Sequence, residues 1–167
     1  MPDAVFLFIA HARAPRVTEL FRARLAAAFA AHGLDAERHC RFLAPMDHAR
    51  FDAVAGLADV FLDNPSWSGH NTALEALPHG LPIVTLPGRL MRQRHALGIL
   101  SLIGVTQTVT ASEAEYVDTA VRLGRDRPWR DEVRDAVRHN GPRAFGDVAA
   151  VRGLEQALRA WGSGPPG

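Results

Sequence analysis

The stretch WSGHNTALEALPHGLPIVTLPG, residues Trp67–Gly88, places a small polar turn and a short helical pattern directly before an apolar run. Another apolar run, DVFLD, precedes it at Asp59–Asp63. A strand, a polar loop, a helix and a second strand in this order are typical of a unit whose two strands run parallel. The stretch therefore predicts an α/β fold with a polar loop beyond the end of a strand.

The same alternation extends toward both ends of the chain. The predicted strands are Ala4–Ala10, His39–Leu43, Asp59–Asp63, Pro82–Leu86 and Thr106–Thr110. The predicted helices between them are Val17–His32, Asp47–Leu57, Asn71–His79 and Arg89–Gly104, and only helical patterns follow Ser112. This order predicts one Rossmann-like domain over residues 1–161, with three layers, a parallel sheet and extra C-terminal helices. Residues 162–167 are predicted to be a disordered tail.

Three side-chain predictions refine these helices. Pro78 should bend or end its helix early, because proline removes a backbone hydrogen bond. The charged pattern Asp126–Asn140 should be a surface helix whose apolar stripe includes Val133 and Val137. Leu158 and Trp161 are expected to dock the last helix onto the sheet.

The composition limits which partners and which cellular compartment are expected for the chain. The chain has 167 residues, 47% of them hydrophobic, which is enough for one compact core. Its formal net charge is +1, so nothing favours nucleic acid or a membrane as a partner. All 19 basic residues are arginine, a bias typical of GC-rich bacterial genomes. Cys40 is the one cysteine, which excludes an internal disulfide and makes the cytoplasm the expected location.

The loop after the third strand carries the most informative polar residues. Ligands of open parallel sheets bind beyond the carboxyl ends of the strands. Gly69 would let the backbone approach a ligand, and the amides of His70–Ala73 would form an anion site at the start of a helix. Glu75 lies on the same face of the first turn as Asn71 and Thr72.

Other interpretations of these residues remain open. Thr72 and Glu75 also fit a capping box, which would contribute about 1 kcal/mol without any ligand. The arginines around Arg94 fit a solvated helix face as well as a phosphate contact. His48 could stack on a base at the rim of the sheet. No zinc pattern, nucleophile elbow, P-loop or dinucleotide motif is present, so these classes of site lose support.

The longer segment LADVFLDNPSWSGHNTALEALPHGLPIVTLPGRLMRQRHALGILSLIGV resembles the catalytic region of O-linked N-acetylglucosamine transferases of the bacterial SPINDLY type. The resemblance extends over most of the chain from Ala4 onward. It implies the GT-B architecture of two facing Rossmann-like domains, of which this chain resembles the second. The implied function is the UDP-sugar-binding half of an inverting glycosyltransferase that acts on protein Ser/Thr hydroxyls.

The resemblance also implies a role for each residue of a nucleotide-sugar site. Gly69–Thr72 would hold the diphosphate, and Glu75, where better-known members carry aspartate, would bind the ribose hydroxyls. Ala44 would present backbone groups to the uracil, and His48 would stack on that ring. Arg94 falls at a matching position after Pro-Gly. The site implied in this way consists of Ala44, His48, Gly69, His70, Asn71, Thr72, Glu75 and Arg94.

The chain departs from the family in ways that shape the remaining expectations. It lacks the lysine that usually meets the phosphates, the tetratricopeptide repeats and the N-terminal catalytic domain. It is therefore expected to be inactive alone, with unknown catalytic residues, no metal or other cofactor, and a protein acceptor bound through the missing domain. The cleft face is a candidate surface for self-association. Two alternatives remain open: a stand-alone nucleotide-sugar-binding or docking module, and half of a UDP-sugar epimerase.

Overall fold

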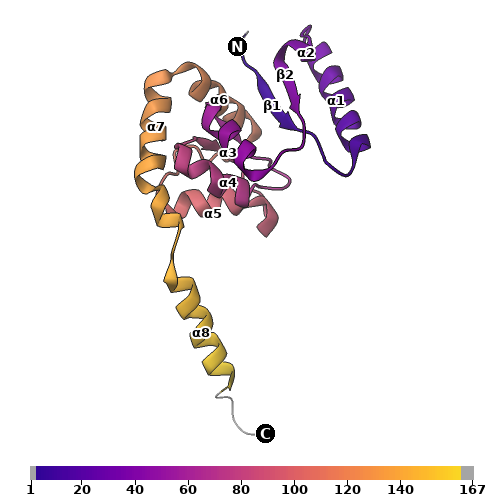
Figure 1. The fold of residues 1–167 in the computed structure, drawn as a ribbon. Coiled ribbons are helices and arrows are strands. Elements are labelled where there is room, and N and C mark those ends of the chain that lie inside the picture. The colour runs from indigo at the N-terminus through magenta and orange to yellow at the C-terminus, as the bar shows by residue number, and fades with distance from the viewer. Residues whose placement is uncertain (1–2, 163–167) are drawn as a thin grey trace. The chain divides into compact units, whose positions relative to one another are not determined.

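The computed structural model describes residues 3–162, and its contacts divide the chain into two compact units, Met1–Val54 and Ala55–Gly167 (Figure 1). The single domain predicted over residues 1–161 stays a prediction. The predicted tail at 162–167 lies outside the described residues, except for Gly162 at the end of the last helix.

Unit 1 is built on a pair of parallel strands, β1 (Phe6–Ile9) and β2 (Cys40–Leu43), paired from Phe6 with Cys40 to Ile9 with Leu43. The connection contains α1 (Pro15–Ala30) and the short α2 (Ala36–His39). Proline in the first turn and Gly33, at φ +69°, bracket α1. Both strands and the helix confirm the sequence prediction.

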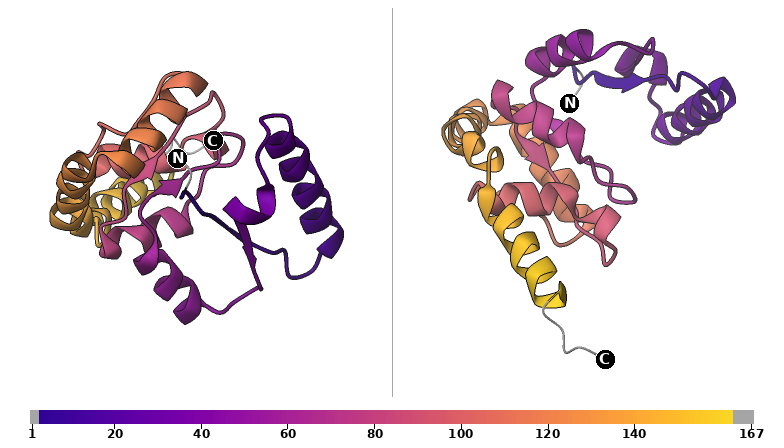
Figure 2. Two further views of the ribbon diagram at one scale, coloured as in Figure 1. Left: turned by 90° about the horizontal axis from the view of Figure 1, so that it is seen from above. Right: turned by 60° about the horizontal axis from the view of Figure 1, so that its bottom comes forward.

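Aromatic contacts join α1 to the strands of unit 1. Figure 2 shows the ribbon of this helix beside the strands. The ring of Phe8 lies 5.0 Å from that of Phe21, centroid to centroid, and 5.2 Å from that of Phe42. Phe6 meets Phe29 edge-on at 6.3 Å. Phe21 and Phe29 of α1 therefore pack against the strand pair.

Unit 2 repeats the parallel arrangement with shorter strands. β3 (Phe61–Leu62) pairs with β4 (Ile83–Val84), and Thr85 forms an isolated parallel bridge with Val109. That bridge is all that forms of the predicted strand Thr106–Thr110. The helical elements are α3 (His48–Leu57, which begins in unit 1), α4 (Asn71–Ala76), η1 (Leu77–His79), η2 (Met91–Gln93), α5 (His95–Leu102), α6 (Glu113–Arg125), α7 (Arg127–Asn140), η3 (Gly141–Ala144) and α8 (Val148–Gly162).

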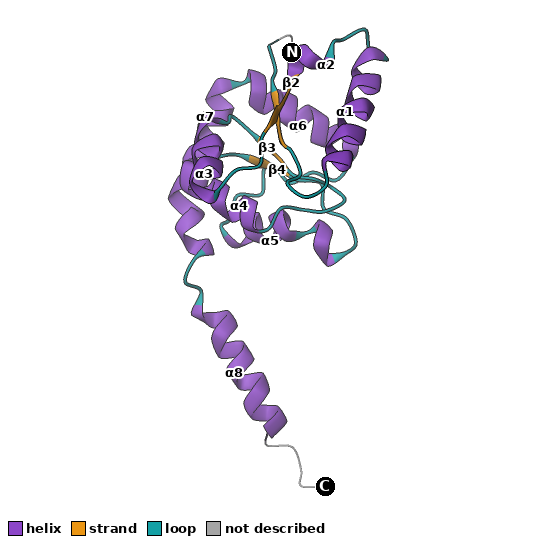
Figure 3. Cartoon of the chain, turned by 45° about the vertical axis from the view of Figure 1, so that its right-hand side comes forward, coloured by secondary structure: helices purple, strands orange, loops and turns teal. Residues whose placement is uncertain are grey.

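In unit 2 the strands β3 and β4 lie among the helices (Figure 3), and residues of both strands belong to the core or pack against it. Val133 and Val137 are fully buried, which confirms the predicted apolar stripe of α7. The largest buried apolar side chains are Leu77, Leu81, Ile83, Leu100, Ile103, Leu123, Val84, Val105, Val133 and Val137. Ala73 and Ala76 of α4, the helix that follows the loop after β3, belong to the same core.

Pro78 ends its helix early, as predicted. The α-helical part of α4 stops at Ala76, and Pro78 sits in the 3₁₀ turn η1. Gly80 then ends the turn with a left-handed φ of +65°.

Two helix predictions are wrong. The helix predicted from Arg89 begins at His95, because the side chain of Gln93 accepts a hydrogen bond from the Leu90 amide and folds the preceding residues into a separate turn. The expected docking of α8 is absent from the described residues: Leu158 is 53% exposed, Trp161 is 80% exposed and no residue of α8 is buried. Apolar spacing shows that a helix has an apolar face but does not say what covers it.

Candidate functional site

A hollow of about 410 Å³ lies where β3 gives way to α4. It is lined by Trp67, Ser68, Gly69, His70, Asn71, Thr72 and His95. The predicted site residues Gly69–Thr72 all belong to this lining. The structure thus brings the polar turn of the sequence to the carboxyl end of a parallel strand, as the α/β prediction required.

Gly69 lets the loop turn tightly into α4. A Cβ at this position would lie 2.6 Å from Thr72 Oγ1 and 3.3 Å from the ring of Phe61. His70 is the N-cap of α4, and its side chain makes no capping hydrogen bond. Thr72 is therefore inside the first turn, so the interpretation of Thr72 as the first residue of a capping box is wrong. The opening amides of a helix have no acceptor within the helix and are available to an anion.

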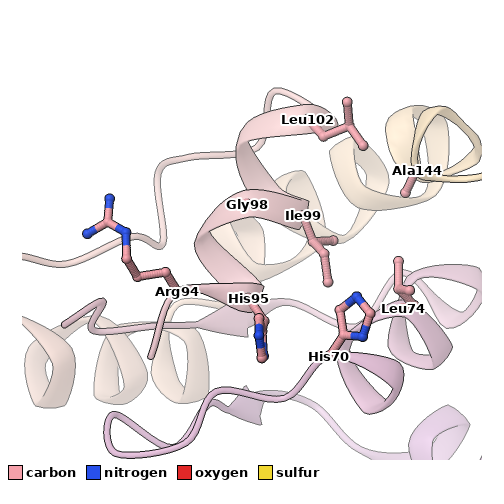
Figure 4. Close-up of a pocket in the computed structure, with 8 residues that line it drawn as sticks. All are labelled: His70, Leu74, Arg94, His95, Gly98, Ile99, Leu102 and Ala144. Carbon is pink, nitrogen blue, oxygen red and sulfur yellow. The ribbon is translucent and has the colours of Figure 1, made fainter. Parts of the chain in front are cut away.

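A second hollow of about 350 Å³ adjoins the first (Figure 4). Its lining consists of His70, Leu74, Arg94, His95, Gly98, Ile99, Leu102 and Ala144. His70 and His95 line both hollows, and their ring centroids are 5.2 Å apart. The two imidazoles therefore form the boundary between a polar hollow and a more apolar one.

Arg94 lines the second hollow and not the first. Its Nη1 donates a hydrogen bond to the carbonyl oxygen of Gly88 at 3.0 Å. In Figure 4 its side chain extends away from the rings of His70 and His95. Its predicted contact with a phosphate stays a prediction.

The remaining predicted residues lie in different parts of the chain. Glu75 is half-buried in α4, one turn after Asn71. Ala44 follows β2 and is exposed, and His48 is the exposed first residue of α3. Ala44 and His48 belong to unit 1, whereas the other six predicted residues belong to unit 2. The role of each in base or ribose binding stays a prediction.

Sequence reasoning missed a buried carboxylate at the end of β3. Asp63 is 1% exposed, and its Oδ1 accepts a hydrogen bond from the Gly69 amide at 2.7 Å. Its Oδ2 accepts from the hydroxyls of Ser68 at 2.8 Å and Thr85 at 2.6 Å. An acidic residue between an apolar strand and a polar loop was the available signal. The three donors show that Asp63 organises the loop from inside.

Ser68 connects the same loop to the start of α5. Its hydroxyl accepts a hydrogen bond from the Ala96 amide at 2.9 Å, and its own amide donates to the carbonyl of Arg92 at 2.8 Å. Its carbonyl lies 3.1 Å from Nδ1 of His95. Because a carbonyl only accepts, Nδ1 carries the proton in this contact, which leaves Nε2 as the other polar atom of the His95 ring.

The Tyr116 phenol donates a hydrogen bond to the backbone carbonyl oxygen of Asp63 at 2.9 Å. We therefore expect the protein to lose stability at alkaline pH. Burial and then the Asp63 carboxylate raise the pKa of Tyr116 to about 12. An unfolded phenol ionises near pH 10, so stability should be intact below about pH 10 and fall as the pH rises toward about 12. Urea unfolding across this range, with phenolate absorbance, measures the loss.

Tyr116→Phe is the control, because it removes the titrating group and keeps the ring. Tyr116 is the one tyrosine and the sequence has no lysine, which leaves few other groups that titrate there. The variant should lack most of the alkaline loss of stability. An identical pH dependence in both proteins would contradict the assignment.

Two further findings concern metals and membranes. Within residues 3–162, no cluster of three or more His, Cys, Asp or Glu side chains is arranged to hold a metal ion. None of the helices described there combines the length and apolar character that a bilayer crossing requires.

Comparison with known proteins gives a consistent result. The model of glycosyl transferase family 41 matches residues 9–146. A UDP-N-acetylglucosamine--peptide N-acetylglucosaminyltransferase of Caenorhabditis elegans is 44% identical over 81 residues, covering 48% of this chain and 7% of the relative. A probable transferase of the same description, SPINDLY of Hordeum vulgare, is 31% identical over 123 residues, covering 71% of this chain and 13% of the relative.

A solved structure agrees with these sequence matches. The K341M mutant of Thermobaculum terrenum O-GlcNAc transferase superposes with a TM-score of 0.78 at 31% identity, over 94% of this chain and 30% of that chain. The α/β fold class predicted from the sequence is thereby confirmed. The chain spans about a tenth of the length of the two curated relatives and about a third of the solved one.

Proposed function

The chain belongs to glycosyl transferase family 41, and we propose that it is the UDP-sugar-binding part of an inverting glycosyltransferase that modifies Ser/Thr hydroxyls of proteins. The observation that carries this proposal is the hollow lined by Gly69–Thr72 at the end of β3, inside the region that matches the family. The names of the relatives support a UDP-N-acetylglucosamine donor and a peptide acceptor.

The chemistry proposed for the hollow is electrostatic. Residues Gly69–Thr72 line the hollow, and in this proposal the backbone amides at the start of α4 would donate to the diphosphate there. The exposed ring of His70 would add a further polar group. Such donors stabilise the negative charge that develops on the leaving UDP. In this proposal the donor amides take the place of a metal ion, and the group that activates the acceptor hydroxyl lies outside the described residues.

The remaining residues complete the proposed donor site. Glu75, one turn into α4, would bind the ribose hydroxyls. Ala44 and His48, beyond the end of β2, would bind the uracil. The free thiol of Cys40 is compatible with the cytoplasmic location that completes the proposal.

Calorimetric titration with UDP, UDP-N-acetylglucosamine and a GDP-sugar tests this function. We expect the two uridine ligands to bind and the GDP-sugar to bind weakly, because uracil contacts select the base. Equal binding of all three would leave no base specificity and would contradict the donor assignment. Turnover of UDP-N-acetylglucosamine without any acceptor would instead identify an epimerase.

The double substitution Thr72→Ala with Glu75→Gln should abolish the rise in melting temperature that UDP produces in the wild-type chain. At about a hundredfold excess of UDP over its dissociation constant, the wild type should gain about 2.7 kcal/mol. Thr119→Ala in α6 is the matched control, because it removes a threonine hydroxyl from a helix remote in sequence from the loop. A UDP shift that persists in the double variant would remove these two residues from the site.

A further inference from the structure

One carboxylate lies in the interior of unit 2, at the base of the loop that lines the larger hollow. Asp63 keeps 1% of its surface exposed. A buried carboxylate destabilises a fold unless donors meet its oxygens. Here the donors are one backbone amide and two hydroxyls, from Gly69, Ser68 and Thr85. Burying a carboxylate costs free energy that its donors must offset. The question is therefore which part of the structure Asp63 holds in place.

Two of the three donors come from the loop itself. Oδ1 receives the Gly69 amide at 2.7 Å, and Oδ2 receives the Ser68 hydroxyl at 2.8 Å. The third donor, Thr85, directly follows β4. Asp63 therefore fastens both the side chain and the backbone of the loop to the ends of the paired strands.

Ser68 transmits this restraint to α5. Its hydroxyl, which donates to Asp63, also accepts from the Ala96 amide, and its carbonyl accepts from the His95 ring. The segments that line the hollow, Ser68–Thr72 and His95, are thus both tied to one carboxylate. Asp63 itself is not among the residues that line the hollow.

We propose that Asp63 is a positioning residue of the donor site: its buried carboxylate holds the Ser68–Thr72 loop in the shape that receives the nucleoside diphosphate, without touching the ligand. The proposal rests on the proposed function and extends it by assigning a role outside the lining of the hollow. A loop held in its binding shape before the ligand arrives loses less conformational entropy on binding.

Comparing Asp63→Ala with Asp63→Asn separates the effect of the hydrogen bonds from the effect of side-chain volume. Alanine removes every acceptor, so the dissociation constant for UDP should rise about tenfold, as for one lost hydrogen bond to a charged group. Asparagine keeps an acceptor for the Gly69 amide, and the two hydroxyls can turn to accept from its amide group. It should therefore recover most of the affinity. Calorimetry well below the melting temperature of each variant gives the constants.

Val133→Ala controls for a loss of stability alone. Val133 is fully buried in α7 and lines neither hollow. Its truncation should lower the melting temperature and leave the affinity for UDP unchanged. If Asp63→Ala binds UDP as tightly as the wild type, or if Val133→Ala weakens binding equally, the positioning role is overturned.

A second pair of variants serves if Asp63→Ala fails to fold. Ser68→Ala and Thr85→Val each delete one hydroxyl that donates to the same Oδ2. Only Ser68 belongs to the loop, so Ser68→Ala should weaken UDP binding and Thr85→Val should leave it close to wild type. Equal effects of the two substitutions would contradict the proposal.

Hydrogen exchange tests the restraint without any ligand. The Gly69 amide should exchange slowly in the wild type, faster in Asp63→Ala and at an intermediate rate in Asp63→Asn, because the carboxylate shields it from water. Unchanged exchange at Gly69 in Asp63→Ala would overturn the positioning role. If the wild type shows this protection but does not bind UDP, the proposed function fails while the restraint on the loop stands.

Discussion

Gly80→Ala is expected to lower the free energy of unfolding by about 2–5 kcal/mol, the sum of left-handed backbone strain and overpacking. Gly80 has φ +65°, a conformation that residues with a Cβ rarely adopt. An added Cβ would lie 2.5 Å from Cγ of Arg138 and 2.9 Å from the backbone carbonyl oxygen of Arg134. The backbone of α7 cannot give way as a flexible side chain would. Urea denaturation followed by circular dichroism measures the loss.

Gly98→Ala is the matched control for this substitution. Gly98 lies in the interior of α5, and an added Cβ there would meet no heavy atom within 4 Å. Alanine should therefore stabilise the helix by about 0.5–1 kcal/mol, since it restricts the unfolded chain. The same change is thus expected to have opposite signs at two positions of unit 2. A loss at Gly80 no larger than at an exposed surface site would contradict the packing of η1 against α7.

Leu100→Ala is expected to lower the free energy of unfolding by about 2–5 kcal/mol, the usual cost of a cavity in a close-packed core. Leu100 is in α5 and is fully buried. The core cluster that contains Leu100 also includes residues of β4 and α4. Thermal unfolding monitored by calorimetry gives the loss.

Leu102→Ala in the same helix is the control. Leu102 is 50% exposed, and truncating a surface side chain usually changes stability by about 0.5 kcal/mol or less. The two leucines lie in the same helix and differ only in how far their side chains are buried. Comparable losses at both positions would mean that α5 presents a different face to the core.

The order of elements was predictable because local patterns specify it. The apolar stripe of α7 and the early end of α4 at Pro78 both follow from residues within a few positions of each other. The loop Gly69–Thr72 was identifiable for the same reason, since glycine and small polar residues after a strand are local signals. The family resemblance added roles for these residues, and the structure places four of them around one hollow.

The errors arose where a local pattern has more than one solution. Thr72 and Glu75 have the spacing of a capping box, but the helix begins one residue before Thr72, with His70 as its N-cap. Arginine-rich residues from Arg89 have helical spacing, but the side chain of Gln93 closes a separate turn. Trp161 lies on the apolar face of its helical pattern but is exposed in the structure. A helical pattern does not specify which surface, if any, covers its apolar face.

By itself, the sequence determined the α/β class, the parallel direction of the strands and the polar loop beyond β3, since each depends on periodicity or on neighbouring residues. Only the tertiary structure revealed how that loop is held. Asp63 meets Thr85 across 22 positions, and Ser68 meets Ala96 across 28. Hydrogen bonds between residues so far apart leave no periodic trace in a single chain, because their partners come together only when the strands and helices pack.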